Sequence, residues 1–87
     1  MIRVVYGAGF PGSAEKLPRK QQQKLAALIG LLQHNPFHPK LHTKQLVGDL
    51  SGFYSFRITR DWRVVFQFHD PETIQLLRVR HRKDVYH

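Results

Sequence analysis

Three strand-like segments follow one another in the second half of the chain, and they constrain the fold more than any other feature. These segments are rich in aromatic and β-branched residues and span residues 53–58, 62–68 and 73–80. Thr59–Asp61 separates the first two and His69–Glu72 the last two. Connections this short are typical of β-hairpins. The sequence therefore predicts a meander of three antiparallel strands.

The first half of the chain predicts one strand and a helical hairpin. Ile2–Tyr6 is a short β-branched and aromatic run that ends in a turn rich in glycine and proline. A short helical turn is expected around Ser13–Lys16, and a longer helix is expected from Pro18 until Asn35-Pro36 ends it. The apolar residues at helical spacing in this longer segment are Leu25, Leu28, Ile29 and Leu32.

The order of these elements, β-α-α-β-β-β, predicts a two-layer α+β fold in which the helices cover one face of the sheet. A length of 87 residues suits one domain, residues 1–87, without a linker. Pro36 and Pro39 indicate that residues 35–45 form an irregular loop across the domain.

Alternation along the strands places arginines on one open face of the sheet. The residues expected to face the helices are Phe56, Ile58, Val64, Phe66 and Phe68. Arg57 and Arg63 then point to the opposite side, because successive side chains of a strand alternate between the two faces.

The third strand-like segment fits either parity, since both sets of alternate positions contain apolar residues. If Leu77 and Val79 face inward, Arg78 and Arg80 join the open face, although Gln75 then also faces inward. We expect this orientation because it gathers the cations on one side.

The charge of the chain indicates a polyanionic partner. Lys+Arg number 14 against 6 Asp+Glu, a formal net charge of +8, which would repel itself unless a polyanion or an acidic protein lay against it. Six of the eight arginines lie at or after Arg57, and guanidinium groups can bind phosphate oxygens bidentately. Lys16, Lys20 and Lys24 are instead expected on a solvated helical face. RNA or another polyanion is therefore expected on the sheet.

Several other kinds of site are excluded by the sequence. The chain has no cysteine, so it can form neither a disulfide nor a thiolate metal site. His34, His38 and His42 are spaced by four, but Pro36 and Pro39 interrupt any helix that would align them for a metal. We therefore expect no metal and no cofactor. The start of the chain has no apolar stretch of signal-peptide or membrane length, so we expect a cytoplasmic protein without a membrane partner.

Two side chains near the end of the chain are candidates for proton transfer. His81 lies in a basic run, where positive neighbours favour its neutral form and make it available as a base, although a surface histidine without a role is the open alternative. Tyr86 follows that run where no strand pattern demands burial. An aromatic ring beside a cationic groove can also stack an unpaired base.

Motifs in the second half of the chain resemble the RelE/ParE superfamily of bacterial toxins. They run from Leu46 to Ile58 (LVGDLSGFYSFRI), from Asp61 to Phe66 (DWRVVF) and from Arg80 to Tyr86 (RHRKDVY). The helical hairpin followed by Asn35-Pro36 extends the likeness over nearly the whole chain. The resemblance implies a RelE/ParE-like fold and a toxin of a type II toxin-antitoxin system with a cognate antitoxin as its partner.

The superfamily divides in function. RelE-type members cleave messenger RNA in the ribosomal A site, whereas ParE-type members inhibit DNA gyrase and are not nucleases. The basic strand residues and the C-terminal tyrosine favour the first branch. The resemblance thus implies a ribosome-dependent, metal-independent mRNA endonuclease that inhibits translation. A gyrase inhibitor or a plain nucleic-acid-binding module is the alternative.

The resemblance also assigns site residues by motif position. The expected catalytic residues are Arg57, Arg63, Arg80, His81 and Tyr86, with the arginines stabilising the phosphorane and either His81 or Tyr86 transferring a proton. RNA binding is expected from Arg60, Asp61, Trp62, Arg78, Arg82 and Lys83. Asp61-Trp62 matches a pair used by another branch of the superfamily, but Arg57 stands where that branch has a histidine. The general base is therefore left open.

Overall fold

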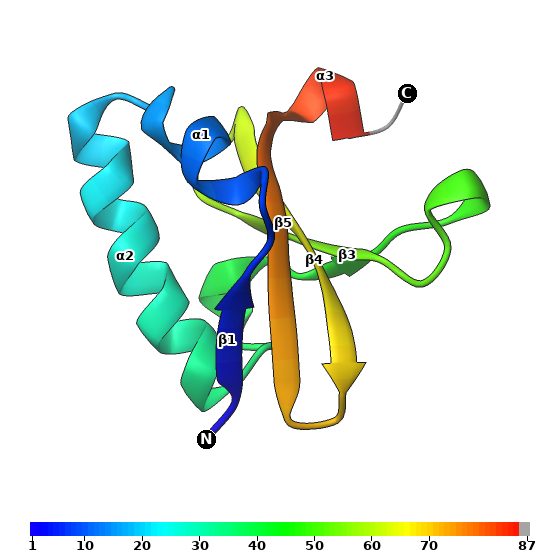
Figure 1. Cartoon of the computed structure of the whole chain (residues 1–87). Coiled ribbons are helices and arrows are strands. Elements are labelled where there is room, and N and C mark those ends of the chain that lie inside the picture. The colour runs from blue at the N-terminus through cyan, green and yellow to red at the C-terminus, as the bar shows by residue number, and fades with distance from the viewer. Residues whose placement is uncertain (86–87) are drawn as a thin grey trace.

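The computed structural model describes residues 1–85, which form five strands, three α-helices and two short 3-10 helices (Figure 1). In chain order these are β1 (Arg3–Tyr6), α1 (Phe10–Glu15), α2 (Arg19–His34), η1 (Pro39–Leu41), β2 (Lys44–Gln45), η2 (Gly48–Leu50), β3 (Tyr54–Arg57), β4 (Trp62–Asp70), β5 (Thr73–His81) and α3 (Arg82–Val85). Within the described residues, no helix is long and apolar enough to cross a membrane.

The strands form one sheet in the order β1-β5-β4-β3-β2. Antiparallel pairing of β3 with β4 and of β4 with β5 confirms the predicted meander, and β1 adds to the edge of β5 in parallel. At the other edge β2 pairs antiparallel with β3, so the prediction that residues 35–45 are irregular was wrong at their end. A strand of two residues is too short for alternation to reveal it, and its pairing depends on the free edge of β3.

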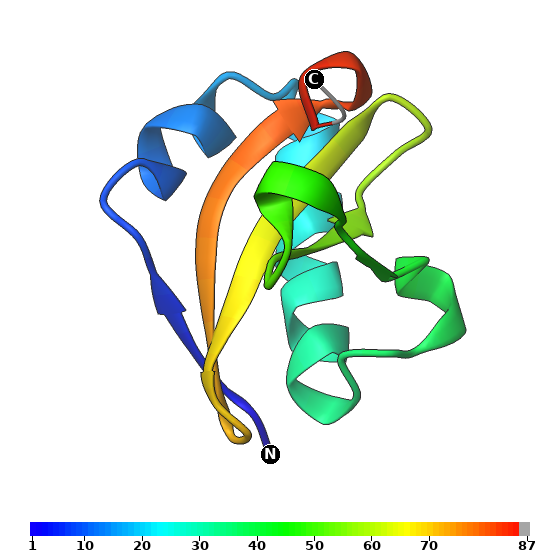
Figure 2. The same cartoon turned by 90° about the vertical axis from the view of Figure 1, so that its right-hand side faces the viewer.

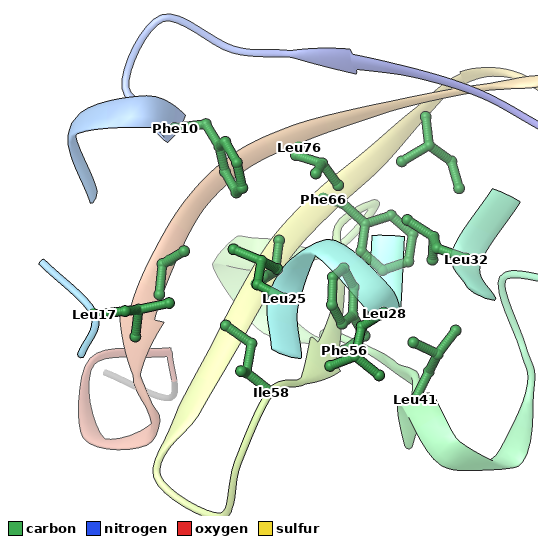
Figure 3. Close-up of a cluster of buried hydrophobic side chains, with 13 residues drawn as sticks. Phe10, Leu17, Leu25, Leu28, Leu32, Leu41, Phe56, Ile58, Phe66 and Leu76 are labelled. Atoms are coloured by element: carbon green, nitrogen blue, oxygen red, sulfur yellow. The ribbon is translucent and has the colours of Figure 1, made fainter. Parts of the chain in front are cut away.

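The predicted helix of the longer segment is confirmed as α2, which lies across one face of the sheet (Figures 1 and 2). Its buried residues Leu25, Leu28 and Leu32 share one core cluster with Phe56 and Phe66 of the sheet (Figure 3). Burying side chains of this size contributes roughly 1.5–3 kcal/mol each, which holds the helix against the sheet. The opposite face of the sheet is not covered by α2.

A bulge in β5 decides which residues of this strand face the core. Val65 pairs with Arg78 while the next residue, Phe66, pairs with Leu76, so Leu77 is an extra residue in the strand. Ile74, Leu76 and Val79 are consequently all buried.

This bulge corrects the predicted parity of the third strand. Leu77 does not face the core, and Gln75 lies opposite Gln67 on the open face, where the Gln67 Nε2 donates to the Gln75 Oε1 at 2.9 Å. Arg78 and Arg80 do lie on the open face as expected. Simple alternation could not show this, because one inserted residue moves every earlier residue of the strand to the opposite face of the sheet from the one that alternation predicts.

Helices α1 and α3 flank the C-terminal end of β5. Helix α1 begins earlier than the predicted turn, and its Ser13 Oγ accepts a hydrogen bond from the Val79 N–H at 2.8 Å. Helix α3 was not expected. The Arg82 N–H at its start donates to the Asp61 carbonyl oxygen at 2.7 Å, which ties α3 to the turn between β3 and β4.

Candidate nucleic-acid interface

Three arginines form a single row across the open face of the sheet. Arg57 lies directly opposite Arg63, and Arg63 lies directly opposite Arg80, on β3, β4 and β5. Directly opposed residues of antiparallel strands point to the same face with Cβ atoms about 4.5–5.5 Å apart. The structure therefore brings together three residues that the sequence places far apart. We call Arg57, Arg63 and Arg80 the arginine row.

The central member of the row is almost completely buried. Arg63 is only 6% exposed, and its Nε and Nη1 find no hydrogen-bond partner within the described residues. The Nε of Arg57 and the Oγ of Ser55 are also buried and unpartnered there. Buried donors are nearly always hydrogen-bonded, and a guanidinium cannot lose its proton to escape its charge.

The arginine row is thus a preorganised site for an anion. Like charges at directly opposed positions destabilise a sheet, and unpaired buried donors add to that cost. A ligand with several negatively charged oxygens offsets the charge repulsion and also pairs the buried donors, because each guanidinium can donate two parallel hydrogen bonds. A phosphate group of a nucleic acid has this chemistry.

A second row on the same face adds two residues that sequence reasoning did not single out. Lys44 lies opposite Ser55, Ser55 opposite Val65, and Val65 opposite Arg78. Ser55 precedes Arg57 by two residues in the same strand, and this shared parity was the signal that could have identified it. Lys44 could not be found in this way, because β2 has no readable pattern of its own.

A cleft of about 560 Å³ lies beside the arginine row, where β5 meets α1 and α3. Four of the expected site residues line it: Trp62, Arg78, Arg80 and His81. Lys16 lines it as well and is exposed, as expected, but it does not share a helical face with Lys20 and Lys24. The reason is that Lys16 lies at the end of α1, whereas Lys20 and Lys24 belong to α2.

His81 lies directly opposite Trp62, on the helical side of the sheet and not on the face of the arginine row, and two contacts hold it at the edge of this cleft. Its ring packs edge-to-face on Trp62 with centroids 5.3 Å apart, and its Nδ1 accepts a hydrogen bond from the Lys83 N–H at 3.3 Å. Because Nδ1 serves as an acceptor, the proton of the neutral ring is assigned to Nε2. In this arrangement the Nε2–H of the neutral ring is available as a hydrogen-bond donor.

Asp61 and Trp62 have structural partners. The Asp61 Oδ1 lies 3.7 Å from the Arg82 Nε, and both side chains are largely exposed, so this ion pair contributes little to stability. Trp62 is half-buried against the core cluster. These contacts position Asp61, Trp62 and Arg82 beside the cleft, which Trp62 also lines.

The remaining expected site residues lie at the periphery or outside the described part of the chain. Arg60 in the β3–β4 turn and Lys83 in α3 are exposed. Tyr86 lies outside the described residues. Among residues 1–85, no group of three or more His, Cys, Asp or Glu side chains is placed to hold a metal ion.

Comparison with known proteins identifies relatives over most of the chain. A family model described as the ParE toxin of the type II toxin-antitoxin system parDE matches residues 12–86. The toxin YoeB of Mycobacterium bovis and the toxin RelK of Mycobacterium tuberculosis are each 36% identical over 58 residues, which is 67% of this chain and 68% of theirs.

Solved structures with the same fold include several toxins. The YoeB/ParE toxin from Agrobacterium tumefaciens has a TM-score of 0.78 at 21% identity and covers 93% of this chain and 99% of its own. YafQ from E. coli has a TM-score of 0.79 at 15% identity and covers all of both chains. A chain of the toxin-antitoxin complex RelBE2 from Mycobacterium tuberculosis has a TM-score of 0.77 at 25% identity and covers 93% of this chain and 98% of its own.

Proposed function

This chain belongs to the ParE toxin family of type II toxin-antitoxin systems, and we propose that it inhibits translation by cleaving messenger RNA on the ribosome. The observation that carries the proposal is the arginine row, whose buried guanidinium nitrogens have no partner in the part of the chain that the structure describes. A surface that only attracted a polyanion would gain nothing from burying Arg63. A site that stabilises the charge developing on one phosphate would gain from this burial, because preorganised donors stabilise such charge most strongly in a low-dielectric environment.

The proposed reaction transfers the RNA phosphate to its neighbouring 2′-oxygen. The 2′-hydroxyl loses its proton and attacks phosphorus, the bond to the 5′-oxygen breaks, and that oxygen takes up a proton. Arg57, Arg63 and Arg80 stabilise the extra negative charge of the pentacoordinate phosphorane, so the reaction needs no metal ion or other cofactor.

Proton transfer is assigned to the two C-terminal candidates. His81, in its imidazolium form and from the cleft that Arg80 also lines, donates a proton to the departing 5′-oxygen. Tyr86 is the candidate for the 2′-hydroxyl. Arg60, Arg78 and Lys83 contact neighbouring phosphates of the messenger RNA or the ribosome, and this substrate would place the protein in the cytoplasm.

The proposed partner besides the ribosome is a cognate antitoxin. A relative of known structure is a toxin-antitoxin complex from Mycobacterium tuberculosis, and another is a YoeB-YefM complex from Staphylococcus aureus. A formal net charge of +8 favours a partner that supplies acidic side chains.

Single-turnover cleavage of messenger RNA on purified ribosomes tests this function. Arg63→Ala and Arg80→Ala should each slow cleavage by about ten- to a thousand-fold, as loss of an electrostatic stabiliser does in other enzymes. Lys24→Ala on the exposed side of α2 is the matched control and should cleave at the wild-type rate. Wild-type rates in both arginine variants would contradict the assignment. Intact messenger RNA together with loss of gyrase supercoiling would support the gyrase inhibitor instead.

A further inference from the structure

A second, smaller pocket lies on the open face beside the arginine row. Its volume is about 270 Å³, and its apolar lining consists of Leu50, Phe53, Val65 and Leu77. In Figures 1 and 2 the segment that contains η2, with Leu50, lies on the side of the sheet away from α2. The pocket is therefore separate from the hydrophobic core and is open to a ligand.

The pocket exists because four separate elements meet there. Val65 has the same parity as Arg63 in β4, and Leu77 reaches this face only through the bulge in β5. Phe53 directly precedes β3, and it has the parity of Ser55 and therefore also belongs to the open face. An aromatic ring, two aliphatic side chains of the sheet and Leu50 thus surround a small apolar space.

The charged lining links this pocket to the anion site. Arg80 belongs both to the arginine row and to the pocket, and Arg78 and Asp84 complete the lining. A ligand that fills both sites must carry an anionic group next to a flat, largely apolar group. A nucleotide has this construction, since one sugar carries both its phosphate and its base.

We propose that the pocket receives one unstacked base of the RNA whose phosphate lies on the arginine row, with Phe53 as its stacking surface. The inference rests on the proposed function. Unpaired bases are commonly bound by stacking on aromatic rings, with polar groups reading their edges. Here the Asp84 carboxylate can accept from a base N–H, and Arg78 can donate to a base oxygen or nitrogen. A space below the usual range of about 300–1,000 Å³ for drug-sized ligands suits a single base.

The test measures binding of short RNA oligonucleotides to the purified protein, with 2′-O-methyl groups to prevent cleavage. One series carries an abasic residue at each position in turn, and its partner series carries 2-aminopurine there. At one position the base should tighten binding by about five- to a hundred-fold over the abasic form, and the 2-aminopurine fluorescence should be quenched. Phe53→Ala should remove both effects and leave the affinity for the abasic oligonucleotide unchanged, whereas Phe53→Trp should retain them.

Phe37→Ala is the matched control. Phe37 is 59% exposed and packs on Tyr54 and Phe68. The parity of Tyr54 and Phe68 places them on the helical side of the sheet, away from the pocket. Replacing Phe37 should therefore not change the binding affinity or the fluorescence in either series. Equal wild-type affinity for abasic and base-bearing oligonucleotides, without quenching, would overturn the base pocket while leaving the phosphate site intact.

Two other outcomes would also decide against the proposal. If Phe53→Ala weakened both series equally, Phe53 would be a structural residue only. If Phe53→Ala weakened binding of the antitoxin and left RNA binding unchanged, the pocket would belong to the interface with the protein partner. If Arg63→Ala bound both series of oligonucleotides as tightly as the wild-type protein does, the phosphate site itself would be rejected, and the base pocket with it.

Discussion

Arg63 and Arg80 lie directly opposite each other on β4 and β5, yet only Arg63 is buried. The two guanidinium groups therefore differ in what they can do. Arg63 is held in place by its surroundings and has unpartnered nitrogens within the described residues, whereas Arg80 is half-exposed and is shared between two cavities. This asymmetry leads to separate expectations for stability and for catalysis.

Replacing Arg63 by methionine should stabilise the free protein. An apolar side chain of similar length removes one of three opposed positive charges, together with the buried Arg63 nitrogens that have no partner within the described residues. A gain of about 1 kcal/mol would raise the Tm of a domain of this size by roughly 4–8 °C. Thermal unfolding followed by circular dichroism measures this, and cleavage activity should be lost in the same variant. A lower Tm would show that Arg63 has stabilising contacts in the fold.

Anions that mimic phosphate should stabilise the wild-type protein specifically. A ligand that binds only the folded state raises its stability according to concentration and affinity, so added sulfate or phosphate should raise the Tm above that in chloride at equal ionic strength. The Arg63→Met variant is the control for general salt effects, and its Tm should respond less. Equal responses in the two proteins would argue against an anion site on the arginine row.

The proposed role of His81 as an acid can be tested through the leaving group. His81→Ala should slow cleavage of normal RNA by about a hundred- to ten-thousand-fold, the usual contribution of general acid–base catalysis. A substrate with sulfur in place of the 5′-oxygen needs no proton on departure, so the variant should cleave it almost as fast as wild-type protein does. Arg63→Ala should gain no such rescue. A His81→Ala defect that persists with the sulfur substrate would assign His81 another role.

Removal of the Asp61–Arg82 ion pair should have little effect. The pair is largely exposed, so Asp61→Asn should lower the free energy of unfolding by less than about 1 kcal/mol. The backbone hydrogen bond that anchors α3 is retained in this variant. Urea denaturation and RNA binding together check this prediction. A large loss of RNA affinity without a loss of stability would show that Asp61 takes part in recognition.

Local patterns were sufficient for most of the fold. The period of two in residues 53–58 and 62–68 and the helical spacing of Leu25, Leu28 and Leu32 are properties of neighbouring residues, and the structure confirms the meander and α2. Strand alternation also placed Arg57 and Arg63 on the open face correctly. Such patterns predict which side of an element a residue occupies because backbone geometry alone sets that side.

Tertiary structure alone decided which residues meet. The row of Arg57, Arg63 and Arg80 depends on the register of three strands, and the outward position of Leu77 depends on a bulge that shifts this register. The burial of Arg63 and the joining of Phe53 to Leu77 in one pocket depend on contacts between distant segments. The sequence by itself determined that cations would gather on one face of a sheet. Only the packing of the chain decided that Arg63 would be buried with two nitrogens that have no partner among residues 1–85, because desolvation is a property of the assembled surroundings and not of any single strand.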